Sequence, residues 1–529
     1  MNLDQETLYD MMFPPISKNF RAVVAIPPIS DFYFTPHRLS FLGARIVSKI
    51  LAENNIKVDF LNFPLKNNHG KTIDLPPDIS YLKNSIIPGE TGKLSYFTKY
   101  QRFGPSPEEC ANAICSFKPS ICFLSCFAYS YAKELIDIAR DVKKLSPDIP
   151  VVVGGAGICA YPLYFIRDSN IDFAIAGEAE ASLRGFIAAM FKKDFSFEHV
   201  PNLFWKKNGQ VLENRIKLNS TSLEIEPVIA KVFETPNKAY FSTSLTRGCA
   251  KGCKFCSNFL THGKLFRAIP IDKFIHTINE FMIDEKTQKK AVFFNFEDDN
   301  MLFSPPEYYL EVMQKIRSKY PGVRFLAENG IDYILLSPDL AGRLIAAGMS
   351  GFNFTVVSIK DEILASQNRK SSLSQFEEMV RFISHKGIPV LSYFICGLKG
   401  DTKQDVVNVL VYLNKLPTLV GISMFYGIPN IPDFTDMALF DNLAPCVSNG
   451  SSAYPWNKTL STIELITAFR LSRYINLIKS DRKSDVELQL IEKVKREGKL
   501  FTFIKEKAGH KIAEVPEYDK EMVRMFLEK

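Results

Sequence analysis

An alternation of apolar, strand-like runs with helical patterns most strongly limits the folds open to this chain. Between residues 239 and 429 the runs are "AYFSTSLTRGC", "AVFFNFEDD", "RFLAENG", "GFNFTVVS", "PVLSYFICGL" and "LVGISMFYGIP". Strands separated by helices pair in parallel through right-handed crossovers. This pattern predicts a partial (β/α)6 TIM-like barrel, with its site at the C-terminal ends of the strands.

A second alternation comes before the barrel. Runs such as "FRAVVAIPPIS", "KVDFLNFPL", "SICFLSCF", "IPVVVGGAG" and "IDFAIAGEAE" alternate with helical patterns and predict a doubly wound, Rossmann-like parallel sheet. Residues 66–107 show no clear period, and we expect a surface excursion there. Asn208-Gly209 predicts a hairpin that bridges two domains. We expect a doubly wound domain over 1–200, a hairpin and linker over 201–240, a barrel over 241–440 and a C-terminal helical domain over 441–529.

Composition narrows the class of protein only a little. The chain has 65 basic and 58 acidic residues among 529, and no basic run resembles a nucleic-acid-binding arm. We therefore expect no nucleic-acid partner. No stretch approaches ~18 uninterrupted apolar residues, and acids stand near the start where a signal peptide would have bases, so we expect a cytoplasmic protein without a membrane span.

Three cysteines lie unusually close together in "SLTRGCAKGCKFCSNF", at Cys249, Cys253 and Cys256. Clustered thiolates select zinc or an iron–sulfur cluster. A closed zinc site needs four protein ligands, and only His262 could complete a local Cys3His set. Without His262, the loop would hold three irons of a cubane and leave the fourth open to a substrate or cofactor.

The C-x3-C-x2-C spacing after the first strand of a βα barrel, with Phe255 just before the last cysteine, resembles the signature of radical S-adenosylmethionine (SAM) enzymes. The resemblance implies a 4Fe-4S cluster on the three cysteines. It also implies that the open iron chelates SAM and that one electron cleaves SAM to a 5'-deoxyadenosyl radical. An electron donor such as flavodoxin or ferredoxin is the implied partner.

Other segments match the same family and imply SAM-binding positions. "FNFEDDN" ends the second barrel strand, where the family binds the methionyl ammonium, although the usual Gly-Gly-Glu is absent. "FTVVSIK" and "NRK" resemble positions that contact ribose or carboxylate, and "FICGLKGDTKQD" resembles the segment beside adenine. The implied SAM-binding residues are Phe255, Glu297, Asp298, Asp299, Ser358, Arg369, Gly397 and Gly400. Each acid could instead cap a helix, and each glycine could serve a plain turn.

The first domain resembles the cobalamin-binding domain of cobalamin-dependent radical SAM enzymes. An Asp-x-His-x-x-Gly motif is missing, because Asp31, His37 and Gly43 are wrongly spaced, so His37 is not expected to bind cobalt. A domain that no longer binds cobalamin is the alternative. The implied cobalamin-lining residues, at strand ends, are Ser125, Gly154, Gly155, Gly177 and Glu178.

The leading hypothesis from this resemblance is methylation of an unactivated carbon in a small-molecule or natural-product substrate. In that class one SAM donates a methyl group through cobalamin and a second SAM supplies the radical. A radical cyclisation or rearrangement without methyl transfer is one alternative. A non-catalytic metal-binding or cobalamin-binding protein is the other. No catalytic residue is assigned from the sequence.

Overall fold

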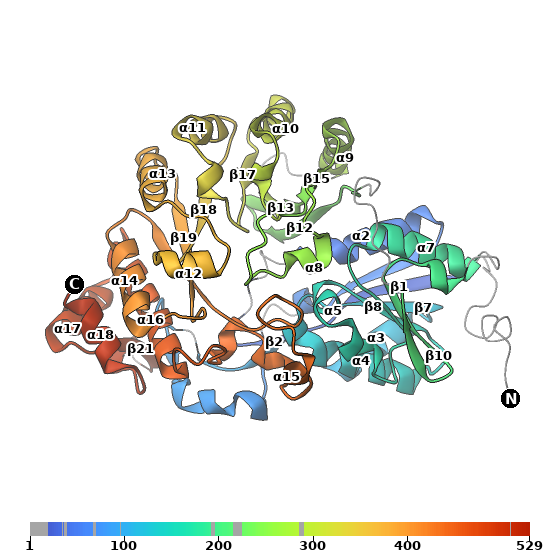
Figure 1. Cartoon of the computed structure of the whole chain (residues 1–529), viewed down its shortest axis with the longest axis horizontal. Coiled ribbons are helices and arrows are strands. Elements are labelled where there is room, and N and C mark those ends of the chain that lie inside the picture. The colour runs from blue at the N-terminus through green and yellow to red at the C-terminus, as the bar shows by residue number, and fades with distance from the viewer. Residues whose placement is uncertain are drawn as a thin grey trace.

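Two α/β halves make up most of the molecule. The computed structural model describes residues 20–33, 35, 40–66, 70–95, 97–191, 196–214, 225–284, 290–507 and 509–529. Figure 1 shows the first half, in blue to green, beside the second half, in green to orange, with the C-terminal segment in red beyond it. His37 lies outside the described residues.

The first half contains a seven-stranded sheet with the order β11-β10-β9-β8-β7-β1-β3. Successive valines of the first strand point to opposite faces: Val23 packs in a hydrophobic cluster with α3 and α4, and Val24 in another with α2 and α7. Helices therefore cover both faces of the sheet, which confirms the Rossmann-like expectation. The elements are β1 Arg21–Ile26, α2 Leu42–Glu53, β3 Lys57–Asn62, α3 Pro107–Ser116, β7 Ile121–Ser125, α4 Ala132–Leu145, β8 Val151–Gly154, α5 Ala156–Ala160, α6 Pro162–Ile166, β9 Phe173–Ile175 and α7 Ala179–Phe191.

The expected hairpin is present, but it belongs to the first sheet. Strands β10 (Leu203–Lys207) and β11 (Gln210–Glu213) pair antiparallel, and β10 pairs antiparallel with β9. Asn208 and Gly209 have φ of 51° and 75°, as a two-residue type I′ turn requires. The hairpin therefore extends the sheet at one edge rather than bridging two domains.

The second half is the expected six-stranded partial barrel. Parallel strands β13, β16 and β17 form one sheet with the antiparallel β12, and β18, β19 and β20 form another. Isolated parallel bridges, Phe325 with Met349 and Ile331 with Phe354, link the two sheets. Figure 1 shows α9, α10, α11, α13 and α14 outside the strands. The elements are β12 Ile229–Glu234, β13 Lys238–Thr243, α9 Ile271–Asp284, β16 Ala291–Phe296, α10 Pro306–Lys319, β17 Arg324–Leu326, α11 Pro338–Ala346, β18 Phe352–Val357, α12 Asp361–Ser366, α13 Leu373–His385, β19 Val390–Cys396, α14 Lys403–Asn414 and β20 Leu419–Met424.

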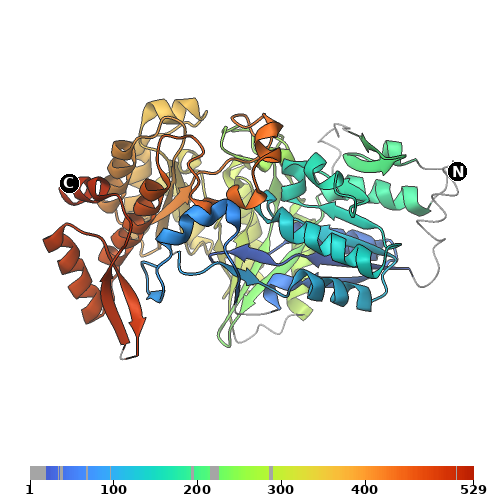
Figure 2. The same cartoon turned by 90° about the horizontal axis from the view of Figure 1, so that it is seen from below.

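The prediction of a surface excursion at residues 66–107 is wrong. Leu82, Leu94 and Phe97 in this segment are buried in the same core as the barrel residues. Glu90 forms a buried ion pair with Arg470 of the C-terminal part. Figure 2 shows the segment, in blue, reaching the red C-terminal hairpin. Its strands are β4 Lys71–Thr72, β5 Glu90–Thr91 and β6 Gln101–Phe103; β6 pairs with β2 Ile29–Asp31.

The C-terminal part contains helices, as expected, and a hairpin that the sequence did not reveal. Strand β21 (Phe501–Glu506) pairs antiparallel with β22 (Gly509–Glu514) and with β5. The first half thus contributes a strand to the C-terminal sheet. The helices after the barrel are α15 Met437–Asp441, α16 Thr462–Lys479, α17 Asp485–Glu497 and α18 Lys520–Leu527.

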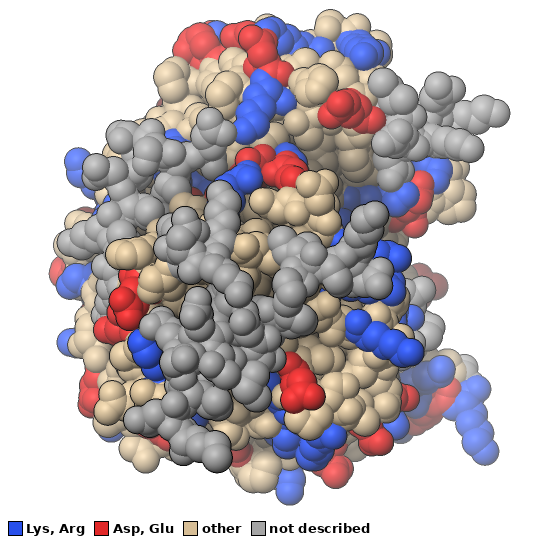
Figure 3. Space-filling view, turned by 90° about the vertical axis from the view of Figure 1, so that its right-hand side faces the viewer, with Lys and Arg blue, Asp and Glu red and all other residues tan. Residues whose placement is uncertain are grey.

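Charges of both signs are interspersed over the described part of the face in Figure 3. This agrees with the near balance of 65 basic and 58 acidic residues. Among the described residues, no helix is both long enough and apolar enough to cross a membrane.

Candidate functional site

The three clustered cysteines lie on a loop that follows the first barrel strand. The loop leaves β14 (Thr246–Arg247), passes through α8 (Asn258–His262) and returns at β15 (Arg267–Ala268), which pairs antiparallel with β14. Gly248 has φ of +88°, and a Cβ there would lie 2.1 Å from the Leu265 carbonyl oxygen. Only glycine allows this close approach at the base of the loop. We call residues 248–266 the cysteine loop.

The thiols of the cysteine loop are close enough to influence one another. Burial, with smaller contributions from the neighbouring Cys253 and Cys249 thiols, raises the pKa of Cys256 to about 11. Within the described residues, no three His, Cys, Asp or Glu side chains are gathered tightly enough to hold a metal ion. Three soft sulfur donors on one loop nonetheless suit a shared cationic cluster, whose charge would stabilise the thiolates.

Two of the three acids after β16 hold the chain around the cysteine loop. Asp298 accepts hydrogen bonds from the Leu245 N–H at 2.9 Å and from the Thr246 hydroxyl at 2.7 Å. Asp299 accepts from the Gly248 N–H at 2.8 Å and from the Asn258 side chain at 2.9 Å. Asp299 therefore orders the loop, and Asp298 orders the strand that leads into it, roles that their sequence positions alone did not indicate.

The third acid, Glu297, faces the first half of the molecule. Its Oε2 accepts a 2.6 Å hydrogen bond from the Ser40 hydroxyl. Its Oε1 is buried and has no hydrogen-bond partner among the described residues. Burial raises the pKa of Glu297, although the Ser40 hydroxyl opposes the rise. Glu297 thus presents a polar atom that a bound molecule could satisfy.

Ser358 follows a strained bulge at the end of β18. The register of β18 against β19 shifts between Thr355 and Val357, and Val357 has φ of 70°. A left-handed conformation is rare for a β-branched residue and costs about 1–3 kcal/mol. Ser358 is buried, and its hydroxyl accepts from the Lys360 N–H at 3.2 Å. Strain of this kind gathers at functional sites, which supports the choice of this strand end.

Arg369 lies close to the cysteine loop through a shared acid. Its guanidinium donates to the Thr355 carbonyl at 3.1 Å and lies 3.6 Å from Asp332. Lys251, between the first two cysteines, forms an ion pair with the same Asp332. The Nε of Arg369 is buried and has no partner among the described residues. Arg369 therefore keeps a donor for a ligand beside the loop.

Gly397 and Gly400 form a tight turn after β19, and Phe255 packs in a core between the halves. Both glycines have positive φ, 92° and 90°. Asp401 accepts from the Gly397 and Leu398 N–H groups, each at 3.0 Å, which fixes the turn. Phe255 contacts a hydrophobic cluster with members from both halves of the molecule. These protein contacts account for all three residues even when no ligand is considered. A contact between this turn and the adenine of SAM therefore stays a prediction.

A cavity of about 290 Å³ separates the ends of the first sheet from the cysteine loop. All five positions expected to line cobalamin contribute to its wall: Ser125, Gly154, Gly155, Gly177 and Glu178. The opposite wall includes Arg247, Thr261, His262 and Glu297, and α2 covers a further side. The contributions of α2 and Arg247 to the cavity wall were not predicted, because no local sequence pattern identifies a helix face that covers a distant strand end.

The glycines of this cavity differ in what they require. Gly155 has φ of +104°, and a Cβ there would lie 2.5 Å from the Cys126 carbonyl oxygen. A Cβ on Gly154 would meet only the Ile175 carbonyl oxygen, at an ordinary 3.6 Å. Gly155 is thus needed by the close approach of its own chain, whereas Gly154 leaves room beside the cavity.

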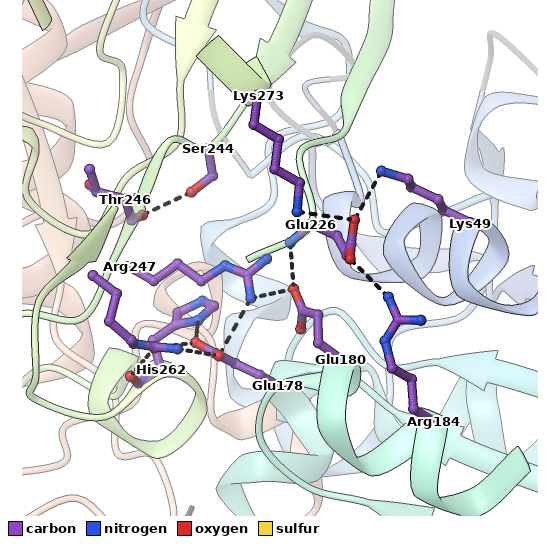
Figure 4. A network of polar contacts seen from close by, with 11 residues as sticks. Lys49, Glu178, Glu180, Arg184, Glu226, Ser244, Thr246, Arg247, His262 and Lys273 are labelled. Carbon is purple, nitrogen blue, oxygen red and sulfur yellow. Dashed lines mark hydrogen bonds and ion pairs between the residues drawn. The ribbon is translucent and has the colours of Figure 1, made fainter. Parts of the chain in front are cut away.

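Glu178 is surrounded by basic groups (Figure 4). Arg267 contacts both of its carboxylate oxygens, at 2.7 and 2.5 Å, and the His262 Nδ1 lies 3.0 Å away. Burial disfavours ionisation of Glu178, but these hydrogen bonds and the charge of Arg247 outweigh it and lower the pKa to about 2. His262 therefore contacts a carboxylate of the first half, and no Cys3His arrangement is found among the described residues.

Comparisons with known proteins agree with this geometry. Residues 243–413 match the family described as the radical SAM superfamily. The chain carries a radical SAM domain. This domain contains the cysteine loop, the acids after β16 and the Asp401 turn.

Longer segments of the chain also resemble proteins named as methyltransferases. The chain is 29% identical over 195 residues to a bacteriochlorophyllide d C-12(1)-methyltransferase of Chlorobaculum tepidum. This match covers 36% of this chain and 41% of that protein. It is 22% identical over 326 residues to an uncharacterised methyltransferase of Pyrococcus horikoshii. This match covers 58% of this chain and 66% of that protein. The chain thus spans less than two thirds of either relative.

One solved structure shares the fold across both halves. It is the radical SAM methyltransferase TsrM from Kitasatospora setae, solved with cobalamin and a [4Fe-4S] cluster bound. The TM-score is 0.57 with 13% sequence identity, and the match covers 80% of this chain and 78% of that one. The order of a Rossmann-like sheet followed by a partial barrel is therefore a known architecture.

Proposed function

We propose that this protein is a radical SAM enzyme that binds a 4Fe-4S cluster, SAM and cobalamin and methylates an unactivated carbon of a small-molecule substrate. The observation that carries the proposal is the shared cavity wall. Arg247 and His262, from either end of the cysteine loop region, face the strand ends of the Rossmann-like sheet across one space. Cobalamin in this space and SAM on the adjoining cysteine loop would act on a single substrate.

The residues present fit the cluster and SAM. Cys249, Cys253 and Cys256 supply three thiolates and leave one iron for the amino acid part of SAM. When bound, the cluster would deliver the electron that cleaves SAM. Glu297 and Arg369 keep buried polar atoms without partners among the described residues, and these suit the ammonium and carboxylate or ribose of SAM. Asp298 and Asp299 act indirectly by holding the cysteine loop and the strand that leads into it.

The residues present also fit cobalamin. Gly154 and the end of β7 at Ser125 leave open backbone at the carboxyl edge of the sheet, where ligands of such folds bind. When bound, cobalamin would carry the methyl group between SAM and substrate. The wall is largely apolar, with Val24, Phe123, Val152 and Ile175 beneath it. A flat apolar cofactor surface would bury well against these side chains.

The methyltransferase names of relatives, the TsrM fold and the cavity together favour methyl transfer over rearrangement. An electron donor such as flavodoxin or ferredoxin would be the protein partner. The proposed substrate is a small molecule that can reach the space between the cavity and the cysteine loop.

Anaerobic reconstitution with iron, sulfide and hydroxocobalamin tests the proposal. We expect the visible spectra of both cofactors and reductant-dependent formation of 5'-deoxyadenosine. Labelled SAM with candidate substrates should then give a product heavier by one methyl group. A colourless protein, or one that binds zinc and leaves SAM intact, would overturn the assignment. Radical formation with no gain in product mass would favour rearrangement instead.

His262→Ala is the companion control. A Cys3His zinc site would lose its metal in this variant, whereas a three-cysteine cluster would keep its iron. Because His262 contacts Glu178, the variant should be assayed for iron content rather than for rate.

A further inference from the structure

The base of the cysteine loop is held by the first half of the molecule. Strands β14 and β15 pair with Arg247 opposite Arg267, and this pair encloses the loop. The Arg247 guanidinium lies 2.8 Å from Glu180 and 3.6 Å from Glu178. The Arg267 guanidinium contacts Glu178 through both carboxylate oxygens. Both arginines at the base therefore extend to acids where β9 leads into α7 in the first half.

The two acids belong to one rigid turn. Gly177, with φ of +82°, turns the chain from β9 into α7, so that Glu178 precedes the helix and Glu180 lies in its first turn. A helix N-terminus stabilises negative charge at these positions. The Gly177 N–H also donates to the Cys159 thiol at 3.0 Å, which fixes the turn from below.

The far side of the cysteine loop rests on the same turn. His262 ends α8, which begins two residues after Cys256, and its Nδ1 lies 3.0 Å from Glu178. A Cβ placed on Gly177 would lie 3.8 Å from the Thr261 carbonyl oxygen, so α8 packs directly on this backbone. Contacts to Glu178 thus come from residues on both sides of the three cysteines.

We propose that Glu178 is a positioning residue for the cysteine loop, so that the first domain sets the geometry of the cluster in addition to lining the cavity. The inference rests on the proposed function. Only 6% of the Glu178 side chain is exposed, with 7% of Arg247 and 9% of Arg267. Removing one partner of such a buried pair leaves charges uncompensated, unlike the loss of a surface ion pair.

The same contacts tie the loop to the cavity. Glu178, Arg247 and His262 all line the cavity, so the side chains that hold the loop also form its wall. Figure 4 shows a second set beside them, in which Glu226 binds Lys49 and Arg184 at 3.0 and 2.8 Å. That set joins the linker before the barrel to α2 and α7, and it includes no residue of the cysteine loop.

Glu178→Gln tests the inference in the reconstituted full chain. We expect about ten- to hundredfold slower 5'-deoxyadenosine formation, because a small displacement of reacting groups has effects of this size. The electron paramagnetic resonance spectrum of the reduced cluster, with and without SAM, should change, and the change should also be present in samples reconstituted without cobalamin, because Glu178 lines the cavity as well. Glu178→Asp, which keeps the charge, should recover part of the rate.

A control variant distinguishes this role of Glu178 from the general effect of weakening a contact made by the first half of the molecule. Asp441→Asn removes a carboxylate that accepts a 2.8 Å hydrogen bond from Tyr161 between the first half and α15, away from the cysteine loop. Its cluster spectrum and SAM cleavage should match wild type. Should Glu178→Gln fail to fold, Arg267→Lys replaces it, since lysine keeps the charge but loses the two-point contact.

Three outcomes would overturn the inference. These are a wild-type cluster spectrum and rate in Glu178→Gln, the same loss in Asp441→Asn, or loss of cobalamin with an unchanged cluster. The last result would make Glu178 a cofactor contact. Failure of the proposed function is distinct, because wild-type protein itself would then leave SAM intact.

Discussion

The backbone N–H of Gly248 donates a 2.8 Å hydrogen bond to the Asp299 carboxylate, which joins the end of the second barrel strand to the residue before Cys249. The other Asp299 oxygen accepts from Asn258, two residues after Cys256. One side chain therefore spans the segment that carries all three cysteines.

Asp299→Ala should loosen the cysteine loop from the barrel side. Charge-assisted hydrogen bonds are worth about 1.5–3 kcal/mol each, so the reconstituted variant should hold less iron and lose it faster to a chelator. Asp299→Asn keeps one acceptor oxygen and should lie between Ala and wild type. Iron retention equal to wild type in Asp299→Ala would show that the loop is ordered by other contacts.

Gly154→Val and Gly155→Val should fail in different ways. At Gly154 an added Cβ would lie 3.6 Å from the Ile175 carbonyl oxygen, an ordinary contact, so the variant should fold and lose cobalamin. At Gly155 the clash at 2.5 Å and the φ of +104° should lower the melting temperature as well. Thermal unfolding and cobalamin absorbance measure the two effects. Full cobalamin binding by Gly154→Val would place the cofactor elsewhere.

Asp401 should make stability depend on pH in the acid range. Burial raises its pKa from 3.8 to about 6, against hydrogen bonds from Gly397 and Leu398 that lower it. The folded state thus binds this proton more tightly than the unfolded state. The contribution to stability is complete below about pH 4 and falls by about 3 kcal/mol as the pH rises to about 6.

Asp401→Asn keeps an acceptor but does not titrate. Denaturant unfolding at pH 4 and pH 7 should therefore show a smaller loss of stability with rising pH in the variant than in wild type. An identical pH dependence for both proteins would mean that folding does not raise the pKa of Asp401.

Arg470→Ala should be among the most destabilising single changes. Arg470 and Glu90 are 2% and 0% exposed, and Thr502 also donates to Glu90 at 2.8 Å. Leaving Glu90 buried without its partner should cost about 3–5 kcal/mol in the free energy of unfolding. Denaturant titration measures this, and a loss below about 1 kcal/mol would contradict the described packing of residues 66–107.

The fold was largely predictable because the periodicity of apolar residues indicates which face of each helix or strand is buried. The strands that end at Phe296 and Cys396 were both expected to alternate with helices, and both strands are present. Residues 66–107 were misjudged because their burial arises from contacts far along the chain. Glu90, for example, pairs with a residue 380 positions away.

The candidate site was predictable in place but less so in role. Gly154 and Glu178, expected at strand ends to line cobalamin, both line the cavity, and their contact with cobalamin stays a prediction. Two side chains that hydrogen-bond to Glu178 are 84 and 89 residues further on, at His262 and Arg267, and no local pattern pairs them with it. The strained φ of Val357 likewise has no signature in the sequence, because valine does not favour it.

The central claim is that the cysteine loop holds a SAM-cleaving cluster while the first domain binds cobalamin separately. Formation of 5'-deoxyadenosine by reconstituted Cys253→Ala tests it most directly, with cobalamin absorbance recorded on the same sample. Two thiolates cannot hold a cubane with one open iron, so we predict no 5'-deoxyadenosine and cobalamin at the wild-type level. Formation of 5'-deoxyadenosine at the wild-type rate would contradict the cluster assignment.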